Sequence, residues 1–342
     1  MLFDHCTWDD DYKEITQKIR RDLLKLAQVE ETEYTTVLMQ GSGSFGVESV
    51  LGSVVPKDGC VLLLSNGAYG ERAAKMCSYY EIPCIHVKQD YNKTPDANEA
   101  EELLKTHPEI IHIMMIHSET TSGILNDIES IGKLAEAYGK VFIVDAMSSF
   151  AGVEIPVKDW YIDFLISSAN KCIQGVPGFS FIIANRVLLM ESKGRARSLC
   201  LDLYDQWAGM EKDGKWRYTS PTHVVLAFEQ AMKELEQEGG IKARHARYQK
   251  NMDTLVENFE NLGFRLYVDK AWQGSIIATF LYPEGKHFDF QEMYAYIKER
   301  GYAIYPGKLT DADTFRIGVI GEIYEEDVLR LTEIMKSYME QA

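Results

Sequence analysis

The sequence predicts an α/β protein that has a large, mostly parallel sheet and a smaller α+β part at its C-terminal end. From about residue 35 to residue 183, short apolar runs alternate with segments of helical periodicity, the pattern of a parallel sheet covered by helices on both faces. Beyond residue 220 the pattern changes to long helical segments and short interleaved strands. We therefore expect a large domain over residues 1–234 and a smaller α+β domain over residues 235–342.

The composition is that of an ordinary globular protein with an acidic balance. In 342 residues, 46% are hydrophobic and the net charge is −16, which argues against nucleic acid or an anionic membrane as a partner. The six cysteines show no spacing typical of metal ligands, and no apolar run is long enough to span a membrane. The opening residues are acidic and lack the basic-then-apolar pattern of a leader. We expect a cytoplasmic protein with reduced thiols and no metal site.

The elements follow from their periodicities. A helix is expected at about residues 10–28, where apolar residues recur at helical spacing after three aspartates. Strands are expected at residues 35–39, 60–64, 82–87, 110–116, 141–144, 164–166 and 179–183. Between them, helices are expected near residues 47–54, 69–80, 96–106 and 128–138. The C-terminal part should hold helices at about 222–238, 241–261, 288–300 and 325–339, and strands at 265–268, 276–280 and 314–317.

A glycine-rich turn, Gly41-Ser42-Gly43-Ser44-Phe45-Gly46, joins the first expected strand to a helix. This arrangement presents free backbone N–H groups and a positive helix end to a phosphate. It also matches the dinucleotide fingerprint, so a nicotinamide dehydrogenase is a rival interpretation. That fingerprint requires an acid about 20 positions later, at the tip of the next strand. The strand at 60–64 ends instead in Ser65-Asn66-Gly67-Ala68-Tyr69, which favours a cradle for a single phosphate.

A cluster of hydroxyl residues, Ser118-Glu119-Thr120-Thr121-Ser122-Gly123, follows the strand expected at 110–116. It should lie at the carboxyl end of that strand, where α/β sheets bind ligands. The hydroxyl groups could bond a ligand or cap the next turn, and the sequence favours neither.

Asp145 and Lys171 each follow an apolar run, and so each is expected at the carboxyl end of a buried strand. A buried carboxylate needs a positive partner, and a lysine held between turns can do covalent amine chemistry. Pyridoxal phosphate requires both, a lysine for its Schiff base and an aspartate for its pyridinium nitrogen. Taken alone, each residue is more simply a turn or surface residue. Together with the phosphate cradle at Gly41–Ser44, they favour a pyridoxal-phosphate site.

Several longer motifs resemble the fold-type I, class V pyridoxal-phosphate aminotransferases, and within that family the members that act on 2-aminoethylphosphonate. The motifs that carry the resemblance are residues 3–12 (FDHCTWDDDY), 38–44 (LMQGSGS), 65–70 (SNGAYG), 117–121 (HSETT), 144–150 (VDAMSSF), 166–178, 215–223 (KWRYTSPTH) and 305–308 (YPGK). The resemblance extends from residue 1 to about residue 340. Family members usually carry a Thr-Pro-Gly-Pro segment ahead of the sequence that starts here, so we expect a shortened N-terminal edge of the large domain.

The resemblance implies the chemical roles of the strand-end residues. Lys171 would form the Schiff base with pyridoxal phosphate and move the proton between the substrate carbon and the cofactor. Asp145 would keep the pyridine nitrogen protonated, and Ser42, Gly43 and Ser44 would bind the cofactor phosphate.

It also implies four further contacts. Tyr69 would stack on the cofactor ring and Thr120 would bond its 3′ oxygen. Thr219 would reach the phosphate of the neighbouring subunit, which makes a homodimer with shared active sites necessary for activity. Arg316 would receive the acidic end of the substrate, although an arginine in an apolar strand can also serve an internal salt bridge.

The implied reaction moves the amino group of 2-aminoethylphosphonate to pyruvate and yields phosphonoacetaldehyde and L-alanine. Alanine–glyoxylate-type chemistry would use the same lysine, aspartate and arginine, and stays an alternative. A cysteine desulfurase would need a cysteine in the second domain, and none follows Cys200. A silent binding protein on the same fold is disfavoured by the intact Lys171 and Asp145.

Overall fold

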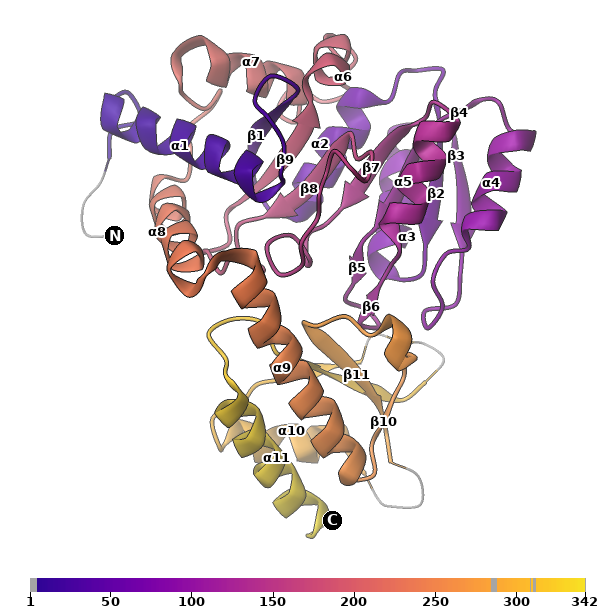
Figure 1. Ribbon diagram of the computed structural model, residues 1–342, viewed down its shortest axis with the longest axis vertical. Helices are drawn as coiled ribbons and strands as arrows, with labels where there is room; N and C mark the ends of the chain where they lie inside the picture. Colours follow the sequence, from indigo (N-terminus) through magenta and orange to yellow (C-terminus); the bar gives the residue numbers. More distant parts are fainter. Residues whose placement is uncertain (1–4, 284–287, 308, 310–311, 342) are drawn as a thin grey trace.

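The computed structural model describes residues 5–283, 288–307, 309 and 312–341. Of the motif residues above, Phe3, Asp4 and Lys308 lie outside this range. The described chain forms a large layered unit around a seven-stranded sheet and a smaller unit around a four-stranded sheet, joined by the long helix α9 (Figure 1).

The elements of the large unit alternate in the order that the sequence predicts. Its helices are α1 (Asp10–Leu26), α2 (Gly43–Val54), α3 (Ala68–Tyr79), α4 (Ala97–Thr106), α5 (Ile128–Ala137), α6 (Arg186–Glu191), α7 (Leu203–Asp213) and α8 (Thr222–Glu238). Its strands are β1 (Tyr34–Gln40), β2 (Cys60–Ser65), β3 (Cys84–Lys88), β4 (Ile110–Ile116), β7 (Val141–Asp145), β8 (Phe164–Ser168) and β9 (Phe179–Asn185). A small hairpin, β5 (Ser118–Glu119) with β6 (Ile124–Leu125), projects beyond β4.

The strand directions bring the candidate residues to one edge of the large sheet. The order is β1-β9-β8-β7-β4-β2-β3, and only β9 runs against the others. The carboxyl ends of the parallel strands therefore meet along one edge, where β1 leads into α2, β2 into α3, β7 ends at Asp145 and β8 leads to Lys171. This is the edge at which α/β sheets bind ligands.

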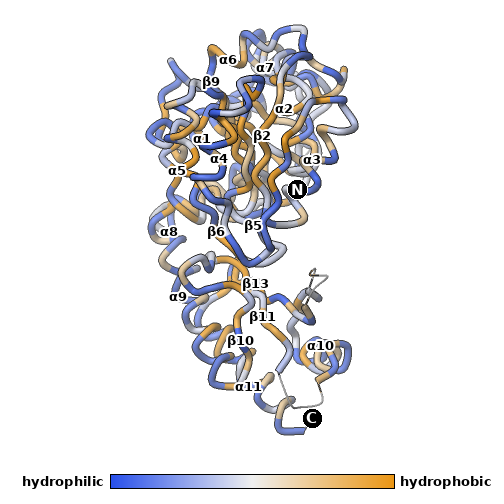
Figure 2. Tube along the Cα trace, turned by 90° about the vertical axis from the view of Figure 1, so that its right-hand side faces the viewer, coloured by the Kyte–Doolittle hydropathy of each residue, from blue (hydrophilic) through white to orange (hydrophobic). Residues whose placement is uncertain are grey.

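Two hydrophobic layers hold the large sheet. Alternate residues of each strand point to opposite faces, so Leu62 and Leu64 pack in one layer and Val61 and Leu63 in the other. Helices α1, α4, α5 and α8 cover the first face, and α2, α3 and α6 cover the second. Figure 2 shows the hydrophobic strands at the centre of the large unit, surrounded by helices in which hydrophilic and hydrophobic residues alternate. The predicted fold class, a mostly parallel sheet with a smaller α+β unit, is confirmed.

The smaller unit is an antiparallel sheet that packs against helices. Its strands are β10 (Arg265–Leu266), β11 (Ile277–Leu281), β12 (Tyr305–Pro306) and β13 (Thr314–Gly318), in the order β10-β11-β13-β12. Helices α10 (Phe290–Lys298) and α11 (Glu325–Met339), with the second half of α9 (Gly240–Asn261), enclose its core. A 3₁₀ turn, Lys270–Trp272, lies between the first two strands.

Helix α9 contacts both units. Near its start, Arg244 donates from Nη1 to the carbonyl of Cys172 at 2.7 Å, and Tyr248 accepts a bond from Gln174 at 2.6 Å. Its later turns carry apolar residues of the small core, such as Leu255 and Phe259. The division of the chain into domains at residues 234 and 235 stays a prediction; that position lies inside α8.

Helices α6, α7 and the hairpin β5–β6 were not predicted from the sequence. Helix α6 has six residues, of which only Leu189 is buried, so it carries almost no periodic signal. Within the described ranges, no helix is long and apolar enough to cross a membrane.

An ion pair at the junction of α8 and α9 offers a test of this packing. The Arg244 side chain is almost fully buried and lies 2.6 Å from a carboxylate oxygen of Glu238. Glu238→Gln leaves that guanidinium without a countercharge, and we expect a loss in the free energy of unfolding on the order of 3 kcal/mol. The measurement is denaturant unfolding beside Glu236→Gln, a change at an exposed position of the same helix. Equal stability of the two variants would show that the pair does not hold the junction.

Candidate active site

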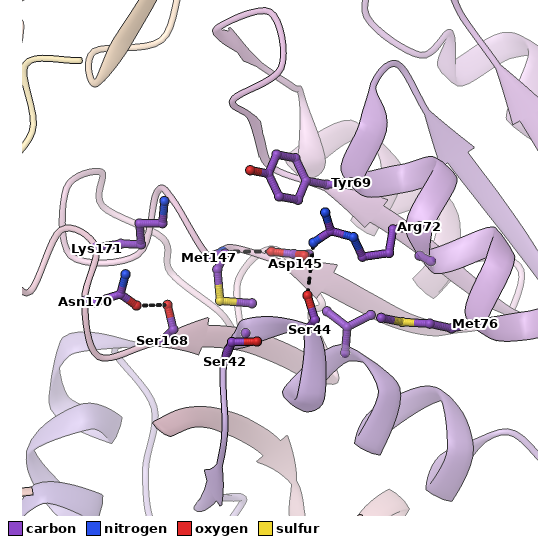
Figure 3. Close-up of a pocket in the computed structure, with 13 residues that line it drawn as sticks. Ser42, Ser44, Tyr69, Arg72, Met76, Asp145, Met147, Ser168, Asn170 and Lys171 are labelled. Carbon is purple, nitrogen blue, oxygen red and sulfur yellow. Dashed lines mark hydrogen bonds between the residues drawn. The ribbon is translucent and has the colours of Figure 1, made fainter. Parts of the chain in front are cut away.

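A cavity of about 240 Å³ opens at the carboxyl edge of the large sheet, between the starts of α2 and α3 and the ends of β7 and β8. Figure 3 shows its side chains converging on one space, with Lys171 and Arg72 entering from opposite sides. The lining consists of Ser42, Gly43, Ser44, Val47, Tyr69, Arg72, Ala73, Met76, Asp145, Met147, Ser168, Asn170 and Lys171. Six of these are residues that the sequence analysis proposed: Ser42, Gly43, Ser44, Tyr69, Asp145 and Lys171.

The start of α2 forms one wall. Gly41 has φ of +103°, a left-handed conformation that glycine adopts without strain, and it turns the chain from β1 into the helix. A Cβ on Gly43 would overlap the end of the Met147 side chain, which would then have to move. The free N–H groups of the first helical turn, with the hydroxyls of Ser42 and Ser44, form a surface suited to a phosphate.

Asp145 lies buried at the end of β7. Its Oδ1 accepts a bond from the backbone N–H of Met147 at 2.9 Å. Burial raises the pKa of this carboxyl from 3.8 to about 7, against that hydrogen bond. The nearby Glu119 raises the pKa further, while Arg72 and Lys171 lower it. A cation bound in the cavity would stabilise the ionised carboxylate.

Lys171 follows β8 in a loop that the rest of the structure fixes. The residue before it, Asn170, accepts a bond from Ser168 at 3.1 Å, and the residue after it, Cys172, receives the bond from Arg244. The Lys171 side chain is half-buried and extends into the cavity (Figure 3). Its amine and the Asp145 carboxylate therefore line the same cavity from neighbouring strands.

Glu119 holds the start of α3, and with it Tyr69. Its carboxylate accepts bonds from the N–H of Tyr69 at 3.3 Å and from the N–H and hydroxyl of Thr121 at 3.0 and 2.5 Å. Burial raises the pKa of Glu119, and these donors lower it. Glu119 was not predicted as a site residue, although it lies within the predicted hydroxyl cluster at residues 118–123.

Arg72 lines the cavity itself and was also not predicted from the sequence. It lies one turn after Tyr69 on α3, so the two side chains share a face of that helix. This spacing was visible in the sequence beside the motif that contains Tyr69.

Arg316 and Thr120 lie together outside the cavity lining. Arg316, on β13, is 4% exposed and donates to the carbonyl of Thr120 at 2.8 Å and to that of Pro306 at 3.2 Å. Among the described residues, no carboxylate lies within ion-pair distance of its guanidinium. Burial lowers the pKa of Arg316, and the nearby Tyr69, Tyr305 and Glu119 raise it. A buried guanidinium that contacts only carbonyl groups and rings is suited to receive an anion.

Thr219 does not line the cavity. It is exposed, and its carbonyl accepts a bond from the Gln40 amide near the end of β1. The basic residues Arg195 and Arg197 donate to backbone carbonyls around the end of α2, and Lys193 lies over the ring of Tyr204. That basic cluster therefore stabilises a chain segment away from the cavity.

The cavity fits pyridoxal phosphate. Its lining offers an amine, a buried carboxylate that lacks a cationic partner in direct contact among the described residues, an aromatic ring and a helix start suited to a phosphate. The burial of Asp145, which is 6% exposed, is the observation that tests the fit, because a protonated ring nitrogen would stabilise the ionised carboxylate at this position.

Comparison with known proteins places these features in a family. Residues 6–330 match the family Aminotransferase class-V. The chain is 54% identical over 339 residues to a 2-aminoethylphosphonate–pyruvate transaminase of Lysinibacillus sphaericus, covering 99% of this chain and 92% of that protein. It is 52% identical over 340 residues to a bifunctional phosphonoacetaldehyde hydrolase/aminoethylphosphonate transaminase of Clostridioides difficile, covering 99% of this chain and 54% of that protein.

A solved structure shows the same fold. The crystal structure of an alanine–glyoxylate aminotransferase of Nostoc superposes with a TM-score of 0.90 at 22% identity, covering 98% of this chain and 89% of that one.

The raised pKa of Asp145 leads to a test on the cofactor-free protein. Because the folded-state pKa lies above the ordinary value, the wild type should lose stability as the pH rises from 3.8 to about 7. Asp145→Asn removes that dependence, so the stability difference between the two proteins should change by about 1–4 kcal/mol over this interval. Unfolding is followed at several pH values, with Asp159→Asn, an exposed site, as the control. Parallel curves for wild type and Asp145→Asn would contradict the burial of an uncompensated carboxyl.

Proposed function

The chain belongs to the class V aminotransferase family, and from this premise we propose that it transfers the amino group of 2-aminoethylphosphonate to pyruvate, giving phosphonoacetaldehyde and L-alanine. The observation that carries the substrate assignment is the match, over almost the whole chain, to transaminases of that name. The cavity supports the chemistry, since its lysine and its buried aspartate lie at the ends of neighbouring strands. Pyridoxal phosphate is the cofactor of the family; when bound, it takes up the amine and provides the ring that stores the released electron pair.

Lys171 and Asp145 divide the proton work. With the cofactor bound, the Lys171 amine would accept a proton at Nζ from the carbon that bears the substrate's amino group and would deliver it to the cofactor. The Asp145 carboxylate would hold a proton on the ring nitrogen of the bound cofactor, since burial makes an unpaired charge at this position costly. Tyr69 covers one side of the cavity, and Thr120 lies beside Arg316. These roles are proposals that rest on position.

Arg316 binds the anionic head of each substrate in turn. The phosphonate of the amine donor and the carboxylate of pyruvate both offer oxygens to a planar guanidinium, which can donate two parallel hydrogen bonds. Arg316 is buried, and its present acceptors, the carbonyls of Thr120 and Pro306, leave its charge without a direct carboxylate partner among the described residues.

We further propose a homodimer in which Thr219 reaches the cofactor phosphate of the neighbouring subunit. Thr219 is exposed, and its carbonyl accepts a bond from Gln40 at the end of β1. Two large exposed side chains lie next to these two segments of the chain. Phe45 is 49% exposed beside Gly41, and Tyr218 is 42% exposed beside Thr219. An exposed apolar surface next to a binding site is typical of a subunit interface. A cytoplasmic location remains a proposal that rests on the six free cysteines.

The substrate proposal is tested by changing Arg316. Wild type should convert 2-aminoethylphosphonate and pyruvate to phosphonoacetaldehyde and alanine, and should use ethanolamine, which lacks the anion, very poorly. Arg316→Lys retains a charge but loses the planar guanidinium. The transition state of each half-reaction should therefore lose about 1–3 kcal/mol of stabilisation, and more in Arg316→Ala. Both products are quantified for each donor.

The matched control is Arg330→Lys, the same change at an exposed position of α11. Equal use of ethanolamine and 2-aminoethylphosphonate by the wild type would sink the substrate assignment. Full activity of Arg316→Ala would make Arg316 a structural residue.

The shared site is tested by mixing two inactive proteins. Lys171→Ala lacks the reacting amine, and Thr219→Ala should lose cofactor affinity without unfolding. Hybrid dimers of the two would contain one site with both wild-type residues, so mixing should restore part of the activity. Activity after subunit exchange is the measurement, with each variant alone as the control. An active monomer, or no recovery in hybrids verified by mass, would rule out the contribution of Thr219 across the interface.

A further inference from the structure

None of the residues of this chain that the family resemblance predicts to bind the cofactor phosphate carries a full positive charge. Ser42, Gly43 and Ser44 contribute N–H groups and hydroxyls, and the start of α2 adds about half a charge. A phosphate monoester carries about −1.5 to −2 at neutral pH. Most of that charge would stay uncompensated in a partly enclosed cavity, which is costly.

Arg72 brings a full charge to this place. Its Nη1 donates to Oγ of Ser44 at 3.0 Å, so the guanidinium already contacts a residue of the phosphate cradle (Figure 3). Its Cζ lies 5.1 Å from the centre of the Tyr69 ring, which orients the side chain toward the cavity.

The Arg72 charge is also available to a ligand. Its neighbour Glu71 pairs with Lys88 at 3.3 Å, whereas no carboxylate in the described part of the chain pairs directly with Arg72. Of the lining residues, Arg72 and Lys171 alone are cationic, and Figure 3 shows them on opposite sides of the cavity. Arg316 lies elsewhere, against Thr120.

We propose that Arg72 is a phosphate-binding residue of the cofactor site, acting with Ser44 and the start of α2. This inference rests on the proposed pyridoxal-phosphate chemistry. The guanidinium can donate two bonds to phosphate oxygens after exchanging its present acceptor, the Ser44 hydroxyl, for the ligand. Its contribution is largest when the cofactor carries the amino group, because no covalent bond to Lys171 then retains it.

The experiment measures equilibrium binding of pyridoxamine 5′-phosphate and of pyridoxamine to the cofactor-free protein by fluorescence or dialysis. Neither ligand forms a Schiff base with Lys171, so the ratio of the two affinities reports on the phosphate contacts. Arg72→Gln should lower the affinity for pyridoxamine 5′-phosphate by about 10- to 100-fold, the scale of a charge-assisted hydrogen bond. The affinity for pyridoxamine should not change. Arg72→Lys should fall between, since an ammonium provides the charge without the fork.

Lys75→Gln is the matched control: it removes one charge from an exposed position of the same helix and should affect neither ligand. An equal loss for both ligands in Arg72→Gln would leave the ratio of the affinities unchanged and would show that Arg72 acts through the Tyr69 ring, and no loss for either ligand would likewise overturn the proposal. If the wild type binds neither pyridoxamine 5′-phosphate nor pyridoxal phosphate, the proposed function itself fails. Wild-type binding with an unchanged ratio in Arg72→Gln overturns the role of Arg72 alone.

Discussion

The arrangement of this site depends on one electrostatic constraint, the burial of the Asp145 carboxylate at the end of β7. Burial raises its pKa to about 7, so a cation next to it would stabilise the ionised carboxylate. The parallel strands position the other lining residues of the cavity, because the carboxyl ends of these strands meet at the edge where Asp145 lies. Lys171 follows the adjacent strand, α2 starts after β1, and α3 carries Tyr69 and Arg72 from the end of β2. The cavity thus has a carboxylate suited to a cation on one side and a helix start suited to an anion on the other. The sheet topology brings together the loops that carry these groups.

The loop that carries Lys171 is fixed from outside the sheet. Arg244 binds the Cys172 carbonyl, Tyr248 binds Gln174, and both come from α9, whose later turns form part of the small core. On the same helix, Arg247 donates to the carbonyl of Gly321 at 2.7 Å, close after β13. The position of Lys171 is therefore linked through α9 to the position of the small sheet.

The sequence predicted the fold class and most elements because their apolar periodicities are strong. It also predicted the residues that follow buried strands, such as Asp145 and Lys171, since that position has a local pattern. Glu119 was missed because its role depends on the hairpin β5–β6, which places its carboxylate at the start of α3, a contact between segments 50 residues apart. Arg72 could have been predicted from the sequence, since it lies three residues after Tyr69 and therefore on the same face of the helix. Helix α6 was missed because only Leu189 of its six residues is buried, and α7 because one of its three buried positions is the polar residue Gln206, which interrupts the apolar period.

The two arginines that we propose to bind anions belong to different units of the structure. Arg72 projects from a helix of the large unit, while Arg316 lies on β13 of the small one and meets the large unit at the Thr120 carbonyl. With Arg316 as anchor of the substrate head, the span between the two contacts is set by how the units are seated against each other, whereas Lys171 and Asp145 stay fixed within one sheet. Selectivity among amine donors would then depend on their length, because the number of bonds between the anionic group and the amino group decides whether the amine reaches Lys171. Changes in the seating of the units would shift that length preference without touching a residue of the cavity.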